Sequence, residues 1–98
     1  MSILVEMLRE EQQRALNMQA AIRQELQGLT KGYISRKVIN GQPAHYLQWR
    51  EGGRILSQHV PKDQLEQVTA QIARRRQLKA MEKDVQANLQ RIKRALKS

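Results

Sequence analysis

Residues 33–60, YISRKVINGQPAHYLQWREGGRILSQHV, decide the fold of this chain. They hold three runs rich in β-branched and aromatic residues, separated by Asn40-Gly41, which stands just before Pro43, and by Gly52-Gly53. Asn-Gly and Gly-Gly supply the positive φ angles that tight hairpin turns require. We therefore expect a three-stranded antiparallel β-meander over about residues 33–60.

A long amphipathic helix is predicted before the meander. Apolar side chains recur every three or four positions over residues 3–29, and no helix breaker interrupts most of this span. Ser2 stands where an N-cap is expected. Gly28 and Gly32 allow the left-handed conformation that ends many helices.

A second amphipathic helix is predicted over residues 62–97, because Pro61 suits a helix start and no Gly or Pro follows it. Together the elements predict an α+β fold, mostly α, in a single domain spanning residues 1–98. The shortest closure lays the two long helices side by side, antiparallel and coiled-coil-like, with the β-meander joining them.

The predicted second helix exceeds the first by about nine residues. If the helices align at the meander, the last turns of the second helix have no partner within the chain, which exposes Leu89, Ile92 and Leu96. Because exposed apolar stripes are usually buried in an interface, we expect these residues to mediate self-association, with a dimer favoured. Fraying of a terminal turn is the alternative.

The chain is strongly basic, with a formal net charge of +9 at pH 7. Residues 1–29 carry −1, residues 30–60 carry +4 and residues 61–98 carry +6. A net positive charge this high usually serves to attract a polyanionic partner. That partner is nucleic acid, an acidic protein or an anionic membrane surface. A membrane is disfavoured, because the second helix lacks a wide apolar face and no run is long enough to span a bilayer. With no cysteine and no signal-peptide pattern, we expect a cytoplasmic protein.

Nothing in the sequence predicts catalysis, a cofactor or a small-molecule substrate. His45 and His59 lie on neighbouring predicted strands, but a metal site needs three or four ligands, and Glu51 is the only carboxylate in the meander. Ser35 and Ser57 have no base and orienting acid assembled with them. We therefore expect a protein that is not an enzyme and that binds no metal.

Basic and aromatic side chains make the meander the candidate nucleic-acid interface. Period-two alternation gives each strand a mainly apolar face and a face bearing charge, and cations with rings or amides are the groups that contact phosphates, sugars and bases. The candidates in and beside the meander are Lys31, Arg36, Lys37, Tyr46, Trp49, Arg50 and Arg54. The second helix adds Arg74, Arg75 and Arg76, which fan over about 200° and cannot all face one groove. An ordinary solvated face is the alternative for both sets.

The meander also resembles a known family. Its residues Tyr46-Leu47-Gln48-Trp49-Arg50-Glu51-Gly52-Gly53 follow a Tyr-Leu-x-aromatic-Arg-x-Gly-Gly pattern, which is similar to that of a widespread uncharacterised domain family of bacteria and archaea. Its hairpins are similar to small sheets at the front of some transposases and integrases. The resemblance covers roughly residues 28–80 and implies the fold without implying an activity. The chain departs from the family pattern at His45, where members tend to have an aromatic residue, and at Pro61-Lys62, where they tend to have Gly-Lys.

The sequence thus favours a non-catalytic nucleic-acid-binding module, with DNA favoured, that uses the basic meander and the basic second helix for contacts to the phosphate backbone. The alternative is an oligomeric helical protein-interaction or scaffold module with no role in nucleic-acid binding.

Overall fold

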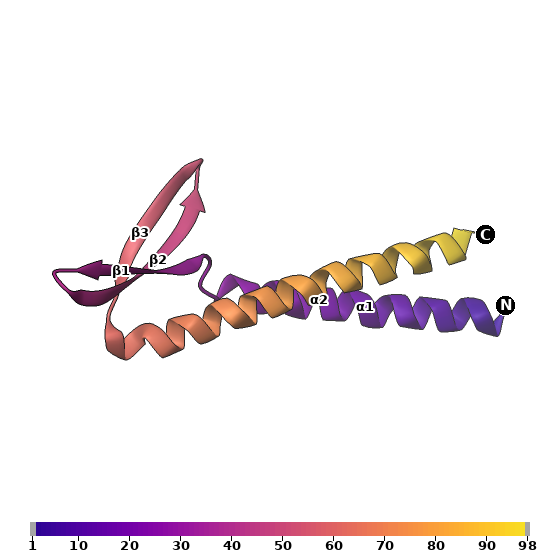
Figure 1. Ribbon diagram of the computed structural model, residues 1–98. Coiled ribbons are helices and arrows are strands. Elements are labelled where there is room, and N and C mark those ends of the chain that lie inside the picture. Colours follow the sequence, from indigo (N-terminus) through magenta and orange to yellow (C-terminus); the bar gives the residue numbers. More distant parts are fainter. Residues whose placement is uncertain (1, 98) are drawn as a thin grey trace. The chain divides into compact units, whose positions relative to one another are not determined.

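The computed structural model describes residues 2–97, and Figure 1 shows the order of the elements. They are helix α1 (Ile3–Gln27), strands β1 (Tyr33–Ile39), β2 (Gln42–Glu51) and β3 (Arg54–Val60), a single 3₁₀ turn (Lys62–Gln64) and helix α2 (Leu65–Lys97). The predicted α+β class, with an antiparallel three-stranded meander between two long helices, is confirmed.

The two ends of α1 differ in how well the sequence predicted them. Ser2 caps the start as expected, because its Oγ accepts a hydrogen bond from the backbone N–H of Leu4 at 3.2 Å. At the other end the prediction was wrong, since Gly28 has a φ of −94° and is not left-handed. Its N–H donates to the carbonyl of Glu25 at 3.2 Å, so a tightened last turn ends the helix.

The chain divides into two compact units, and α2 contributes to both. We call the first the helical unit, which combines α1 with the part of α2 from Gln77 onward. We call the second the sheet unit, which spans Leu29–Arg76 and holds the three strands, the 3₁₀ turn and the first part of α2.

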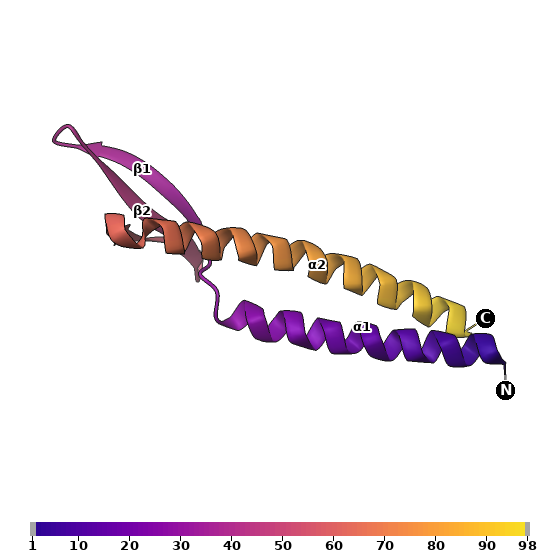
Figure 2. The same cartoon turned by 90° about the horizontal axis from the view of Figure 1, so that it is seen from below.

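The helical unit is an antiparallel pair, and the two termini of the chain lie at the same end of it (Figures 1 and 2). Ala15 and Ile22 of α1 and Leu78, Val85 and Ile92 of α2 are buried in its core. The residues of α1 that are buried or half-buried alternate by three and four positions, which is the heptad spacing of a coiled-coil seam. They are Val5, Leu8, Gln12, Ala15, Gln19, Ile22 and Leu26.

The expected overhang of the second helix was wrong. Ile92 is only 4% exposed, and Leu89 and Leu96 are half-buried. The expectation assumed that the helices align from the meander, but residues 65–76 belong to the sheet unit, which leaves residues 77–97 to pair with α1. The two partners in the helical unit are therefore similar in length.

The sheet unit is a twisted meander of order β1-β2-β3, and Ile34 and His45 on one of its faces line a groove with Leu65 and Ile72 of α2. Both hairpins turn on two residues with positive φ, Asn40 and Gly41 at 53° and 76° and then Gly52 and Gly53 at 57° and 78°, as the sequence predicted. Val60 on β3 and Ile72 on α2 are buried in the core of this unit.

Two contacts fix the chain where it enters the sheet unit. The side-chain oxygen of Gln71 on α2 accepts hydrogen bonds from both the backbone N–H and the hydroxyl of Thr30. Gly32 has a φ of 121°, and a Cβ at this position would overlap the backbone carbonyl of Gln48. Only glycine fits there, because the entering chain passes directly against β2.

Candidate nucleic-acid interface

The pairing of the strands assigns every meander side chain to one of two faces, because residues opposite each other in an antiparallel pair lie on the same side of the sheet. The register places Tyr33 opposite Gln48 and Ser35 opposite Tyr46, and Tyr46 is in turn opposite His59. We call this side the outer face. Its members are Tyr33, Ser35, Lys37, Ile39, Gln42, Ala44, Tyr46, Gln48, Arg50, Ile55, Ser57 and His59.

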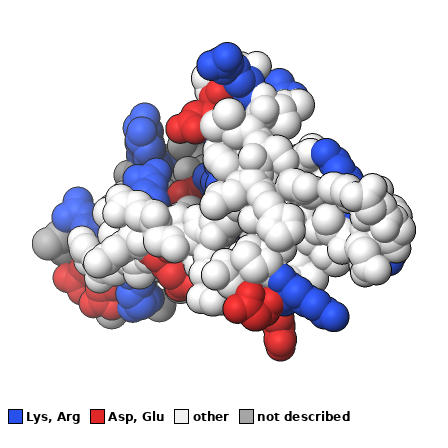
Figure 3. Space-filling model, turned by 90° about the vertical axis from the view of Figure 1, so that its left-hand side faces the viewer, with Lys and Arg blue, Asp and Glu red and all other residues white. Residues whose placement is uncertain are grey.

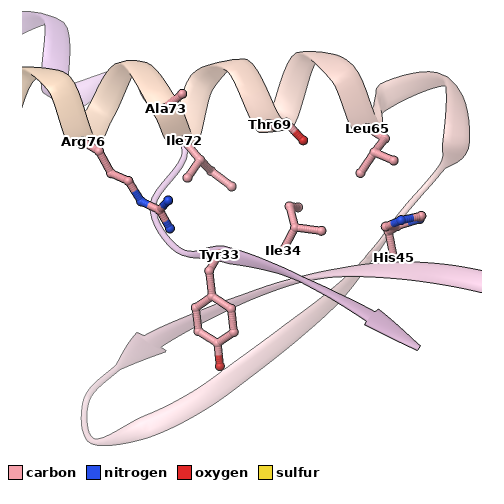
Figure 4. A pocket seen from close by; sticks show the side chains of 8 residues that line it. All are labelled: Tyr33, Ile34, His45, Leu65, Thr69, Ile72, Ala73 and Arg76. Carbon is pink, nitrogen blue, oxygen red and sulfur yellow. The ribbon is translucent and has the colours of Figure 1, made fainter.

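The other side, here called the inner face, meets α2. Ile34 and His45 share a groove with Leu65 and Ile72 of α2, and Figure 4 shows the side chains of all four converging on it. The groove has a volume of about 470 Å³. The outer face therefore remains as the side of the sheet that α2 leaves uncovered within this unit.

A cation and two rings meet at the middle of the outer face. The Nζ of Lys37 on β1 lies 5.1 Å from the centroid of the Tyr46 ring on β2. The His59 ring on β3 packs edge-on against the same tyrosine, with centroids 5.5 Å apart and planes at 74°. Both geometries are favourable, since a ring face attracts a cation and ring pairs prefer edge-to-face contact. We call these three residues the Lys37–Tyr46–His59 cluster.

Polar and aromatic side chains extend the outer face beyond this cluster. Tyr33 is 47% exposed and lies in one cross-strand row with Gln48 and Ser57. Arg50 is exposed on β2 two residues further along. The ammonium of Lys31 donates to the Arg50 carbonyl oxygen at 3.1 Å, so a second cation lies beside this strand.

The candidate residues of the sequence do not form one surface. Lys37, Tyr46 and Arg50 lie on the outer face, but Arg36, Trp49 and Arg54 lie on the inner one, opposite His45, Leu56 and Glu51 respectively. The predicted alternation of the strands was correct and already contained this division. Residue type alone groups these cations and rings together, whereas the alternation places them on two faces.

The arginine triplet of α2 is also divided. Arg76 lines the groove with Tyr33 and Ile34, and its guanidinium extends from α2 toward β1 in Figure 4. Arg75 is half-buried and Arg74 is exposed. As the helix geometry predicted, the three side chains point in different directions and do not make one phosphate-binding row.

Most of the chain matches a known protein family. Residues 4–70 match the family model described as Domain of unknown function (DUF6788). The chain belongs to this family. The DUF6788 match includes all three strands and both hairpins, so the expected resemblance to an uncharacterised domain family is confirmed. It also reaches back into α1, which the resemblance read from the sequence did not include. Neither the curated proteins nor the solved structures gave a match.

The two histidines of this DUF6788 chain lie on opposite faces of the sheet, because His45 pairs with Val60 and His59 pairs with Tyr46. Within residues 2–97, no group of three or more His, Cys, Asp or Glu side chains is placed to hold a metal ion. None of the helices in the same part of the chain is long and apolar enough to cross a membrane. The candidates drawn from the sequence did not include four further members of the outer face, which are Tyr33, Gln48, Ser57 and His59.

Net positive charge is concentrated in the sheet unit. Its 48 residues, Leu29–Arg76, hold nine basic and three acidic side chains, a net charge of +6, whereas the rest of this DUF6788 chain holds nine and six, a net charge of +3. Figure 3 shows the Lys and Arg side chains in separate groups, several beside Asp or Glu, with uncharged surface between them.

Proposed function

We propose that this chain is a non-catalytic nucleic-acid-binding module and that the outer face of the sheet is its contact surface. The observation that carries the proposal is the Lys37–Tyr46–His59 cluster, which sets a cation and two rings side by side on a side of the sheet that α2 leaves uncovered. The net charge of +6 on the same unit supports it, since a polyanion is the partner that such charge attracts.

Each group of the cluster has a role that its chemistry suits. The Tyr46 ring offers a flat surface on which a base stacks, and stacking of this kind contributes about 1–3 kcal/mol per base. Lys37 is exposed, so its ammonium can leave the ring and contact a phosphate when a base takes its place. Gln48, Ser57 and Arg50 supply further donors for sugar and phosphate oxygens.

This arrangement favours single-stranded nucleic acid over duplex. A tyrosine on an open sheet face reaches only bases that are already unstacked, because bases within a duplex are covered on both sides. Tyr33 and Tyr46 are diagonal neighbours across β1 and β2, about 7–8 Å apart in an antiparallel pair, so two rings are offered along one path.

The test is fluorescence anisotropy of the full chain with labelled single-stranded DNA, single-stranded RNA and duplex DNA at two salt concentrations. We expect binding to the single strands that weakens with salt, with a log–log slope of about 0.7 per phosphate contact. Absence of binding to all three nucleic acids near 0.1 M salt would contradict the proposal.

The matched variants are two double substitutions that remove the same charge from different faces. Lys37→Ala with Arg50→Ala alters the outer face, and Arg36→Ala with Arg54→Ala alters the inner face. We expect the outer pair to weaken binding about tenfold and the inner pair to weaken it far less. Equal losses in the two would mean that bulk charge, and not the outer face, holds the nucleic acid.

A protein-interaction module is the second candidate, and one observation favours it. Large apolar side chains of α1 are exposed, among them Ile3 at 74% and Leu4 at 65%. An apolar helix face of this kind suits a protein partner rather than a polyanion.

A further inference from the structure

Helix α1 carries a second regular stripe besides the one that packs on α2. It consists of residues spaced alternately by three and four positions, all of them exposed: Leu4, Met7, Glu11, Arg14, Met18 and Ala21. Leu4, Met7 and Met18 are 65%, 58% and 51% exposed. We call this set the outer stripe of α1. A spacing of three and four is that of a coiled-coil seam, and here the seam has no partner within the described residues.

We infer that the outer stripe pairs α1 with the α1 of a second copy of this chain, in antiparallel orientation. The inference goes beyond nucleic-acid binding and rests on different residues, since the outer face of the sheet takes no part in it.

The stripe is complementary to itself in the antiparallel register. In such a pair the first seam position of each heptad faces the fourth position of the partner helix. Leu4 then faces the partner's Ala21, and Met7 faces the partner's Met18. Glu11 faces the partner's Arg14, so the two-fold symmetry makes this ion pair twice.

At every position of this register an apolar residue therefore faces an apolar residue, or a charged residue faces one of opposite charge. The same helix aligned in parallel would put Glu11 against the partner's Glu11 and Arg14 against the partner's Arg14, and both contacts are repulsive. Self-complementarity of this sort is what an isologous dimer requires, whereas an unrelated partner would not call for it.

The centre of the stripe is open to receive a partner. No ion pair found within residues 2–97 involves Glu11 or Arg14. A groove of about 230 Å³ lies there, lined by Glu11, Arg14 and Met18 of α1 and by Val85 and Asn88 of α2. A second helix laid along the stripe fills this groove and covers the apolar side chains at both of its ends.

The interface differs from the one expected from the sequence. Leu89, Ile92 and Leu96 were the candidates, but Ile92 is buried in the helical unit and so is not free to meet another chain. Self-association remains the expectation, and α1 now supplies its surface.

Charge exchange across the stripe is the test, read by analytical ultracentrifugation of the full chain over a range of concentrations. We expect Glu11→Arg alone, and Arg14→Glu alone, to raise the dimer dissociation constant about tenfold or more, because each places like charges opposite each other twice. The double variant Glu11→Arg with Arg14→Glu restores opposite charges and should recover the dimer.

The control is Arg9→Glu, the same charge change as Arg14→Glu but on an exposed residue outside the stripe, and it should leave the dimer unchanged. Circular dichroism of each variant establishes that the helices are intact. A wild-type chain that stays monomeric at all concentrations, or single variants that dimerise as tightly as wild type, would overturn the inference.

Cysteine cross-linking tests the register separately. The chain has no cysteine of its own, so a Met7→Cys chain and a Met18→Cys chain each carry one thiol. We expect an oxidised mixture of the two to form the covalent dimer efficiently and each chain alone to form little, because position 7 faces position 18 of the partner. Efficient cross-linking of Met7→Cys with itself would indicate a parallel pair and contradict the proposal.

Discussion

At the scale of single residues, close backbone approach constrains the sheet unit more strongly than turn geometry does. Gly32 and Gly53 both have positive φ, but only Gly32 lies against another backbone, that of Gln48. A side chain at Gly53 meets nothing within 4 Å. A side chain at Gly53 would therefore cause conformational strain alone, whereas one at Gly32 would cause both strain and steric overlap.

We predict that Gly32→Ala destabilises the protein by about 3 kcal/mol or more, whereas Gly53→Ala costs about 1 kcal/mol. Both substitutions strain φ, and only the first also forces β2 away from the entering chain. Urea denaturation followed by circular dichroism measures both at one protein concentration. Equal destabilisation by the two would show that the overlap is relieved at no cost.

Residue patterns predicted local structure well where the chemistry is local. Ser2 and the dipeptides Asn40-Gly41 and Gly52-Gly53 act through their own backbone, and each does what the sequence indicated. Gly28 did not, because a helix also ends without a left-handed residue when its last turn tightens. The Lys37–Tyr46–His59 cluster is different, because it depends on the register of three strands. Alternation along one strand gives the faces of that strand but not its register with its neighbours.

At the scale of elements, the buried positions of α2 change phase along its length. Leu78, Val85 and Ile92 follow a spacing of seven, but Ile72 is six residues before Leu78 and so lies on another side of the helix. Apolar residues recur every three or four positions along most of α2, but not between Ile72 and Leu78, where the change of phase falls. The wrong prediction for Ile92 followed from treating α2 as one continuous seam.

The seam of α1 also contains two half-buried polar residues, Gln12 and Gln19, and Gln19 lines a groove with Leu89 and the polar Gln86 and Gln90 of α2. Polar residues at seam positions commonly fix the register of a helix pair at some cost in stability.

We predict that Gln19→Leu stabilises the protein by about 1 kcal/mol, because it adds apolar surface to the core of the helical unit. The shift in the urea midpoint at a fixed protein concentration measures it, with Gln24→Leu at an exposed position of α1 as the control. A loss of stability would mean that the Gln19 amide contributes more than the apolar surface that replaces it.

At the scale of the whole molecule, the two proposals predict more together than either does alone. A dimer formed through the outer stripe of α1 carries two sheets and therefore two nucleic-acid contact surfaces. A single strand long enough to reach both sheets makes the second contact within the same complex, which raises its effective concentration.

We therefore predict that a long single strand binds at least about tenfold more tightly than one that covers a single sheet. The difference should disappear in the Glu11→Arg variant and return in the double variant with Arg14→Glu. Anisotropy titrations with short and long oligonucleotides of one repeated sequence measure it. If strand length had the same effect in wild type and in Glu11→Arg, dimerisation would not contribute to the affinity for nucleic acid.

The strand order β1-β2-β3 leaves the two outer strands with unpaired backbone groups along one side. Such edges tend to recruit strands from other molecules, and charged side chains on them are a common protection against aggregation. Arg36 and Lys37 on β1 and Arg54 on β3 are placed to give this protection. We therefore expect a chain that lost these cations to expose a strand edge for fibrillar growth, whether or not it still bound nucleic acid.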